Sequence, residues 1–140
     1  MRAILICLAI CVPAACTLAP GPATPEEAAY LERVMACPLT FVIPANEIEL
    51  TWGRIQGFLG KYSSMKIQTV TEYVIETYNP VESEVDFGYS IVRTPVEEEV
   101  EIAIRCVTGN MFCRREADLN AHILAHYART GEIIPKFITI

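Results

Sequence analysis

The sequence predicts an α+β domain: an antiparallel sheet of about three to five strands with helices packed on one face, in the order α-β-α-βββ-α-(β). Apolar residues recur at helical spacing in three segments, and three segments rich in Val, Ile, Thr and Tyr are joined by short links. A chain of 140 residues with 52% hydrophobic and 20% charged residues suits one folded domain rather than a disordered chain.

The first predicted helix begins at a recognisable cap. Thr24 precedes Pro25, which fits the first helical position, and Glu27 stands where a capping box needs an acidic side chain. We expect this helix to end near Ala36, because Pro38 disfavours helix in the residue before it. The apolar run 39–43 then predicts a short strand that Pro44 closes.

The second predicted helix follows a cap at Asn46 and ends at Gly60. Its apolar positions are spaced by four, three and four residues, which places them on one side of a helix. These positions are Ile48, Trp52, Ile55 and Leu59.

Three strands are predicted in the middle of the chain, at residues 66–78, 86–93 and 96–107, with turns at 79–80 and 94–95. Short links between consecutive strands favour an antiparallel meander. In the third strand a period of two places four side chains on one face, namely Val100, Ile102, Ile104 and Cys106.

The last predicted helix spans residues 116–129 and ends at Gly131. The apolar tail that follows, with Pro135 inside it, suggests an interrupted edge strand. The stripe expected to face the core consists of Ala117, Ala121, Leu124 and Ala128.

The first 23 residues have the layout of a secretory signal peptide, so we expect residues 24–140 to form the single mature domain. One arginine at position 2 precedes an apolar run that is about half the roughly 20 residues a membrane-spanning helix needs. Cleavage after Ala14, Ala15 or Ala23 would leave small residues at the cut. The body then carries ten basic and seventeen acidic residues, a net charge of −7.

Residues 12–16, Val-Pro-Ala-Ala-Cys, resemble the lipobox of bacterial lipoproteins, although that family prefers leucine where Pro13 stands. The resemblance covers the leader alone and implies that Cys16 is lipidated and becomes the new N-terminus. Acyl chains would anchor a protein whose acidic surface does not attract it to an anionic membrane. The resemblance predicts an exported protein that is lipid-anchored in the cell envelope; otherwise we expect it in the periplasm or secreted.

The body contains Cys37, Cys106 and Cys113. A disulfide between Cys106 and Cys113 would close a short loop with Gly-Asn turn chemistry and would be stable in an oxidising compartment. Cys37 could instead pair with either of them, so three single bridges remain open. No C-x-x-C pair is present, which disfavours a redox-active thiol over a structural one.

Two histidines stand one helical turn apart, at His122 and His126, a spacing that zinc sites use. Asp118 lies a further turn back and could orient or join them. The glutamate of the H-E-x-x-H motif is absent, because Ile123 stands in its place. The alternative interpretation is a solvent-facing stripe that also includes Arg129.

These features favour a small exported, non-enzymatic protein that needs no cofactor and binds a protein partner of the cell envelope through its sheet or its tail. The alternative is a zinc-binding protein or metal-assisted hydrolase that uses His122 and His126, and a third is a thiol-redox protein that uses Cys37. The acidic balance excludes a broad nucleic-acid surface. Membrane contact is expected only through the lipid anchor, and Arg114 and Arg115 are interpreted as ordinary surface residues.

Overall fold

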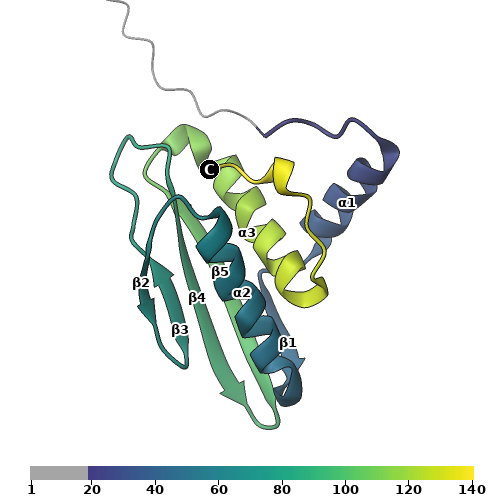
Figure 1. Ribbon diagram of the computed structural model, residues 1–140, viewed down its shortest axis with the longest axis vertical. Coiled ribbons are helices and arrows are strands. Elements are labelled where there is room, and N and C mark those ends of the chain that lie inside the picture. Colours follow the sequence, from purple (N-terminus) through teal and green to yellow (C-terminus); the bar gives the residue numbers. More distant parts are fainter. Residues whose placement is uncertain (1–18) are drawn as a thin grey trace, which may run out of the picture.

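The computed structural model describes residues 19–140, so Cys16 and most of the predicted leader lie outside the described residues. Five strands form one antiparallel sheet in the order β1-β5-β4-β3-β2, and helices lie on one side of it (Figure 1). The predicted α+β class is confirmed. The elements are α1 (Pro25–Ala36), β1 (Thr40–Pro44), α2 (Ile48–Tyr62), β2 (Ile67–Val70), β3 (Val74–Thr77), β4 (Phe87–Val96), β5 (Glu99–Thr108) and α3 (Arg114–Thr130), with 3-10 turns η1 (Ala45–Glu47), η2 (Met111–Cys113) and η3 (Pro135–Phe137).

The start of α1 follows the predicted cap. The Thr24 side chain accepts a hydrogen bond from the Glu27 N–H, and the Glu27 carboxylate accepts one from the Ala23 N–H. Together these bonds satisfy donors that a helix start would leave unpaired.

The core lies between the sheet and the helices α2 and α3. The predicted stripe of α2 is buried from Trp52 to Leu59, and the Phe58 ring meets the Tyr89 ring of β4 at a centroid distance of 6.0 Å. The alanines of α3 let that helix lie close to β5, because short side chains shorten the distance between packed elements. The sheet contributes Ile75, Ile91, Ile102 and Ile104.

The helix α1 packs on α3, on the side away from β4 and β5 (Figure 1). Its fully buried Tyr30 meets the His126 ring of α3 edge-on at 5.6 Å and stacks on Phe137 of the tail at 6.0 Å. The tail thus completes a small second core between α1 and α3.

The predicted edge strand in the tail is wrong. Asn120 of α3 is fully buried; its Oδ1 accepts from the Thr139 N–H at 3.0 Å, and its Nδ2 donates to the Thr139 carbonyl at 2.8 Å. One side chain therefore satisfies both backbone groups that a strand neighbour would otherwise pair, and the tail docks on α3 through η3.

The single strand predicted at residues 66–78 is also wrong, because it divides into β2 and β3. The Thr71 hydroxyl accepts hydrogen bonds from the Tyr73 and Val74 N–H groups, and the Thr71 N–H donates to the Val74 carbonyl. These local bonds turn the chain without Gly, Pro, Asn or Asp.

The turn predicted at residues 94–95 lies instead at Glu97 and Glu98, and β4 continues through Pro95. The proline is tolerated because the last hydrogen bond from β4 to its neighbour β3 is from the Arg93 N–H to the Tyr73 carbonyl, so at Pro95 no bond to β3 is lost.

Candidate functional site

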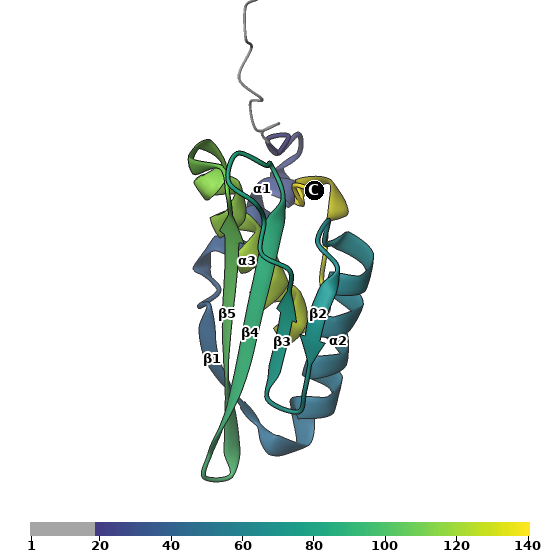
Figure 2. The same ribbon diagram turned by 90° about the vertical axis from the view of Figure 1, so that its left-hand side faces the viewer.

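One face of the sheet has no helix over it within the described part of the chain. Figure 2 turns this face toward the viewer, with α2 and α3 behind it. Side chains alternate along each strand, so every second residue of the long β4–β5 pair points away from the helices. We call this surface the open face; it comprises Thr40, Val42 and Pro44 of β1, Glu99, Glu101, Ala103, Arg105 and Val107 of β5, Gly88, Ser90, Val92, Thr94 and Val96 of β4, and Val74 and Glu76 of β3.

The strand register aligns the apolar side chains of the open face in its centre. Ala103 pairs with Thr40 on one side and with Val92 on the other, and Val92 in turn pairs with Val74. Val42 in the neighbouring row is 47% exposed, and Val92 is 39% exposed. Together with the half-buried Ala103 and Val74, these two exposed valines form an apolar strip across β1, β5, β4 and β3.

A polar hollow of about 330 Å³ adjoins this strip. Glu76, Ser90 and Arg105 are successive partners across β3, β4 and β5, and the Ser90 hydroxyl donates to the Glu76 carboxylate at 3.1 Å. Among residues 19–140 no ion pair joins Arg105 to a carboxylate. The hollow therefore offers a carboxylate on one side and a guanidinium on the other; Asn79, Tyr89 and Val107 complete its lining.

The two histidines proposed from sequence make separate structural contacts. His122 Nδ1 donates to the Cys37 carbonyl at 2.8 Å, which ties the end of α1 to α3. His122 Nε2 lies 3.9 Å from Asp118 Oδ1, so the structure does bring Asp118 beside the first histidine.

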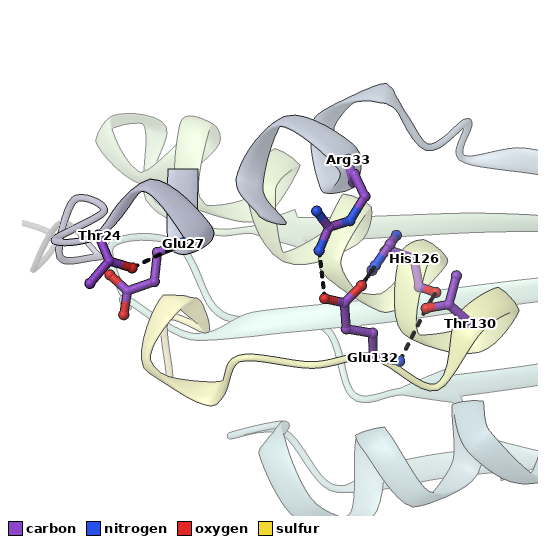
Figure 3. A network of polar contacts seen from close by, with 6 residues as sticks. All are labelled: Thr24, Glu27, Arg33, His126, Thr130 and Glu132. Carbon is purple, nitrogen blue, oxygen red and sulfur yellow. Dashed lines mark hydrogen bonds and ion pairs between the residues drawn. The ribbon is translucent and has the colours of Figure 1, made fainter. Parts of the chain in front are cut away.

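The second histidine is buried, and the predicted solvent-facing stripe is wrong at this position. His126 is 5% exposed because Tyr30 packs against its ring, and its Nε2 donates to Glu132 Oε2 at 3.0 Å. Glu132 Oε1 accepts from Arg33 of α1 at 2.6 Å (Figure 3). These contacts hold the start of the tail between α1 and α3.

The pKa of Glu132 is lowered from 4.5, first by the hydrogen bond from His126 and then by that from Arg33. The Glu27 pKa is lowered too, chiefly by Lys136 of the tail, with which it forms an ion pair. Both carboxylates therefore favour the charged form while the tail is docked.

Metal chemistry requires a third ligand, and no group of three His, Cys, Asp or Glu side chains suited to a metal ion occurs in residues 19–140. His126 points toward Glu132 and the tail, whereas His122 points toward Asp118 and the Cys37 carbonyl. Although the two histidines lie one turn apart on the same helix, their rings therefore contact different partners.

The expected Cys106–Cys113 bridge does not form in this structure, since Cys106 is a free thiol. Cys106 lies on the helix-facing side of β5 opposite Tyr89, and burial raises the pKa of its thiol to about 12. Cys113 is fully buried just before α3. Cys37 is a free buried thiol with the Arg129 guanidinium 3.6 Å from its sulfur.

The sequence predicted a sheet with helices on one face, but not which residues form the open face, and the role of Glu132 was not predicted. The alternation of apolar and polar residues in β4 indicates that the sheet has two different faces. It does not indicate which of the two faces the helices cover. Glu132 lies in the irregular segment after α3 and contacts a partner 99 residues away, which no local sequence pattern encodes.

No helix of the described chain is long and apolar enough to cross a membrane. Compared with known proteins, the chain matches no family model, no curated protein and no solved structure.

Proposed function

We propose that the protein is a small exported, non-enzymatic binding protein, anchored by lipid at Cys16, that binds a protein partner through the open face. The observation that carries the proposal is the uncovered sheet face, on which Val42 of β1 and Val92 of β4 are exposed beside Ala103 and Val74. Apolar patches of this kind on a soluble domain commonly mark interaction surfaces.

The C-terminal tail, which the sequence suggested as the other binding segment, packs against α1 and α3 within the domain. Phe137 is fully buried, and Asn120 pairs with both backbone groups of Thr139. This leaves the sheet as the better candidate surface.

The charges around the strip indicate what kind of partner fits it. Glu76, Glu99 and Glu101 lie on the open face against the single Arg105, and the hairpin turn adds Glu97 and Glu98 beyond its end. Complementary charge favours encounter and register, so the partner should present an apolar patch with a basic border.

Support for a binding role also comes from how the polar side chains of α3 are used. His122 and His126 join α3 to the end of α1 and to the tail, and Asn120 holds the C-terminus. Each has a structural partner, which favours the interpretation of α3 as a supporting helix.

Photo-cross-linking in the native host tests the proposal. Benzoylphenylalanine placed at Val92 should give a discrete protein adduct, whereas the same probe at the exposed Gln56 of α2 should give none. Equal adducts from both positions, or none from Val92, would contradict the proposal.

A charge reversal then tests specificity. Glu101→Lys should weaken the Val92 adduct because it opposes a basic partner, while Glu49→Lys on the exposed side of α2 should leave it unchanged. If Glu101→Lys leaves the yield of the Val92 adduct unchanged, the proposed basic border of the partner is wrong.

A further inference from the structure

Two large apolar side chains project from the end of the molecule at which the described chain begins. Phe112 and Met111 of η2 are 75% and 68% exposed, the highest values among large hydrophobic residues in the described part of the chain. Val81 of the β3–β4 connection is 62% exposed, and its carbonyl lies so close to Gly109 that a Cβ there would come within 2.0 Å. With Arg114 and Arg115, both exposed, these residues form what we call the tip.

The backbone beneath the tip is firmly held. The Asn110 side chain accepts from the Phe112 N–H at 3.0 Å, and the Cys113 N–H donates to the Asn110 carbonyl at 3.0 Å. Cys113 itself is fully buried. The exposure of Met111 and Phe112 is therefore a consequence of a hydrogen-bonded turn rather than of a loose loop.

The tip lies close to the point at which the chain enters the domain. Ala19 lines a hollow of about 210 Å³ together with Arg115, Glu116 and Leu119, at the start of α3. Figures 1 and 2 place the start of the described chain and η2 at the same end of the long axis. In the sequence, Cys16 precedes Ala19 by three residues.

We propose that the tip rests in the interface of a phospholipid bilayer, with Met111 and Phe112 among the upper acyl chains and the two arginines at lipid phosphates. The inference rests on the proposed lipid anchor at Cys16, because acyl chains there would hold this end of the domain against the membrane. Apolar side chains gain by leaving water, and guanidinium groups bind phosphate oxygens while their stems lie in apolar surroundings.

The acidic groups near the tip limit how far it inserts. Glu82, Glu84 and Asp86 lie in the β3–β4 connection and carry the opposite charge to Arg114 and Arg115. These carboxylates keep the connection in water, so Met111 and Phe112 alone reach the acyl chains and the two arginines stay at the phosphates. The acidic turn at Glu97 and Glu98 lies at the far end of the molecule, pointing away from the membrane (Figure 1).

The test uses the protein purified from its native host with its native modification. It is reconstituted into phosphatidylcholine vesicles whose acyl chains carry bromine, a quencher of tryptophan fluorescence. Phe112→Trp reports from the tip and Val96→Trp from the opposite end of the sheet; Trp52 is buried, so the wild-type signal is subtracted. We expect the tryptophan introduced at the tip to lose most of its emission and the one introduced at the far end of β4 to keep its emission.

Intact mass measured first separates the two proposals. Acylated protein in which the Phe112→Trp variant is quenched no more than the Val96→Trp variant would overturn the tip inference while leaving the lipid anchor standing. Protein without acyl chains would overturn both the anchor and the tip. Because both substitutions replace exposed side chains, circular dichroism should show unchanged folding.

Discussion

A single carboxylate links α1, which is distant in the sequence, to the end of α3 and the start of the tail. Glu132 accepts hydrogen bonds from His126 of α3 and Arg33 of α1, and its own N–H donates to Thr130, whose hydroxyl donates to the His126 carbonyl (Figure 3). Because these contacts favour the charged carboxylate, the pKa of Glu132 is lowered from 4.5. A lowered pKa in the folded state means that the charged form stabilises the fold.

Replacement of the Glu132 carboxylate should remove its contribution to the pH dependence of the free energy of unfolding. Glu132→Gln should lower the free energy of unfolding by at most about 1 kcal/mol near neutral pH, since the side chain is 44% exposed and solvent screens the pairs. The sign follows from the lowered pKa: the stabilisation is present above 4.5 and is lost as the pH falls through the folded-state value.

Urea unfolding of both proteins between about pH 3 and pH 7 measures this difference. Glu49→Gln on the exposed side of α2 is the matched control and should show no such pH dependence. A Glu132→Gln deficit that persists unchanged at the lowest pH would contradict the electrostatic explanation.

At the scale of elements, the apolar faces of the helices were predictable, but element ends were less so. The predicted Asn46 cap and Gly60 end of α2 are wrong, because that helix begins at Ile48 without a side-chain cap and continues to Tyr62. The stripes of α2 and α3 and the cap of α1 follow from spacing and side-chain chemistry within a few residues. The division of β2 from β3 depends on Thr71 bonds that compete with strand pairing, and the docking of the tail depends on Asn120. Both features depend on side-chain hydrogen bonds, which the spacing of apolar residues in the sequence does not predict.

The β4–β5 hairpin turn is strained at one residue, which gives a prediction at this scale. Glu97 has a φ of +55°, in the left-handed region that favours glycine. Glu97→Gly should therefore stabilise the domain by up to about 1 kcal/mol, because it removes the steric cost of a side chain there.

The neighbouring turn residue is the control. Glu98 does not have a positive φ, so Glu98→Gly should give no gain and should slightly destabilise the domain through chain entropy. Chemical unfolding compares the two variants with the wild type. Equal effects of the two substitutions would show that backbone strain at Glu97 does not limit stability.

For the whole molecule, the location of the candidate site could not be predicted from the sequence. The strand patterns identify two faces of a sheet, but which face stays open depends on where α1, α2 and α3 pack. The histidine pair of α3 was the most conspicuous sequence feature, yet burial beneath Tyr30 and the tail directs His126 to Glu132. Meanwhile the tip residues Met111 and Phe112 stand out only when exposure is known.

We propose a protein displayed outside the cytoplasm, with its tip against a bilayer and the open face of its sheet directed to a partner. Intact mass of the protein isolated from its native host tests this most directly. We expect a polypeptide that begins at Cys16 and carries acyl chains. Full-length polypeptide that retains Met1 and is recovered from the cytosol without acyl chains would contradict it.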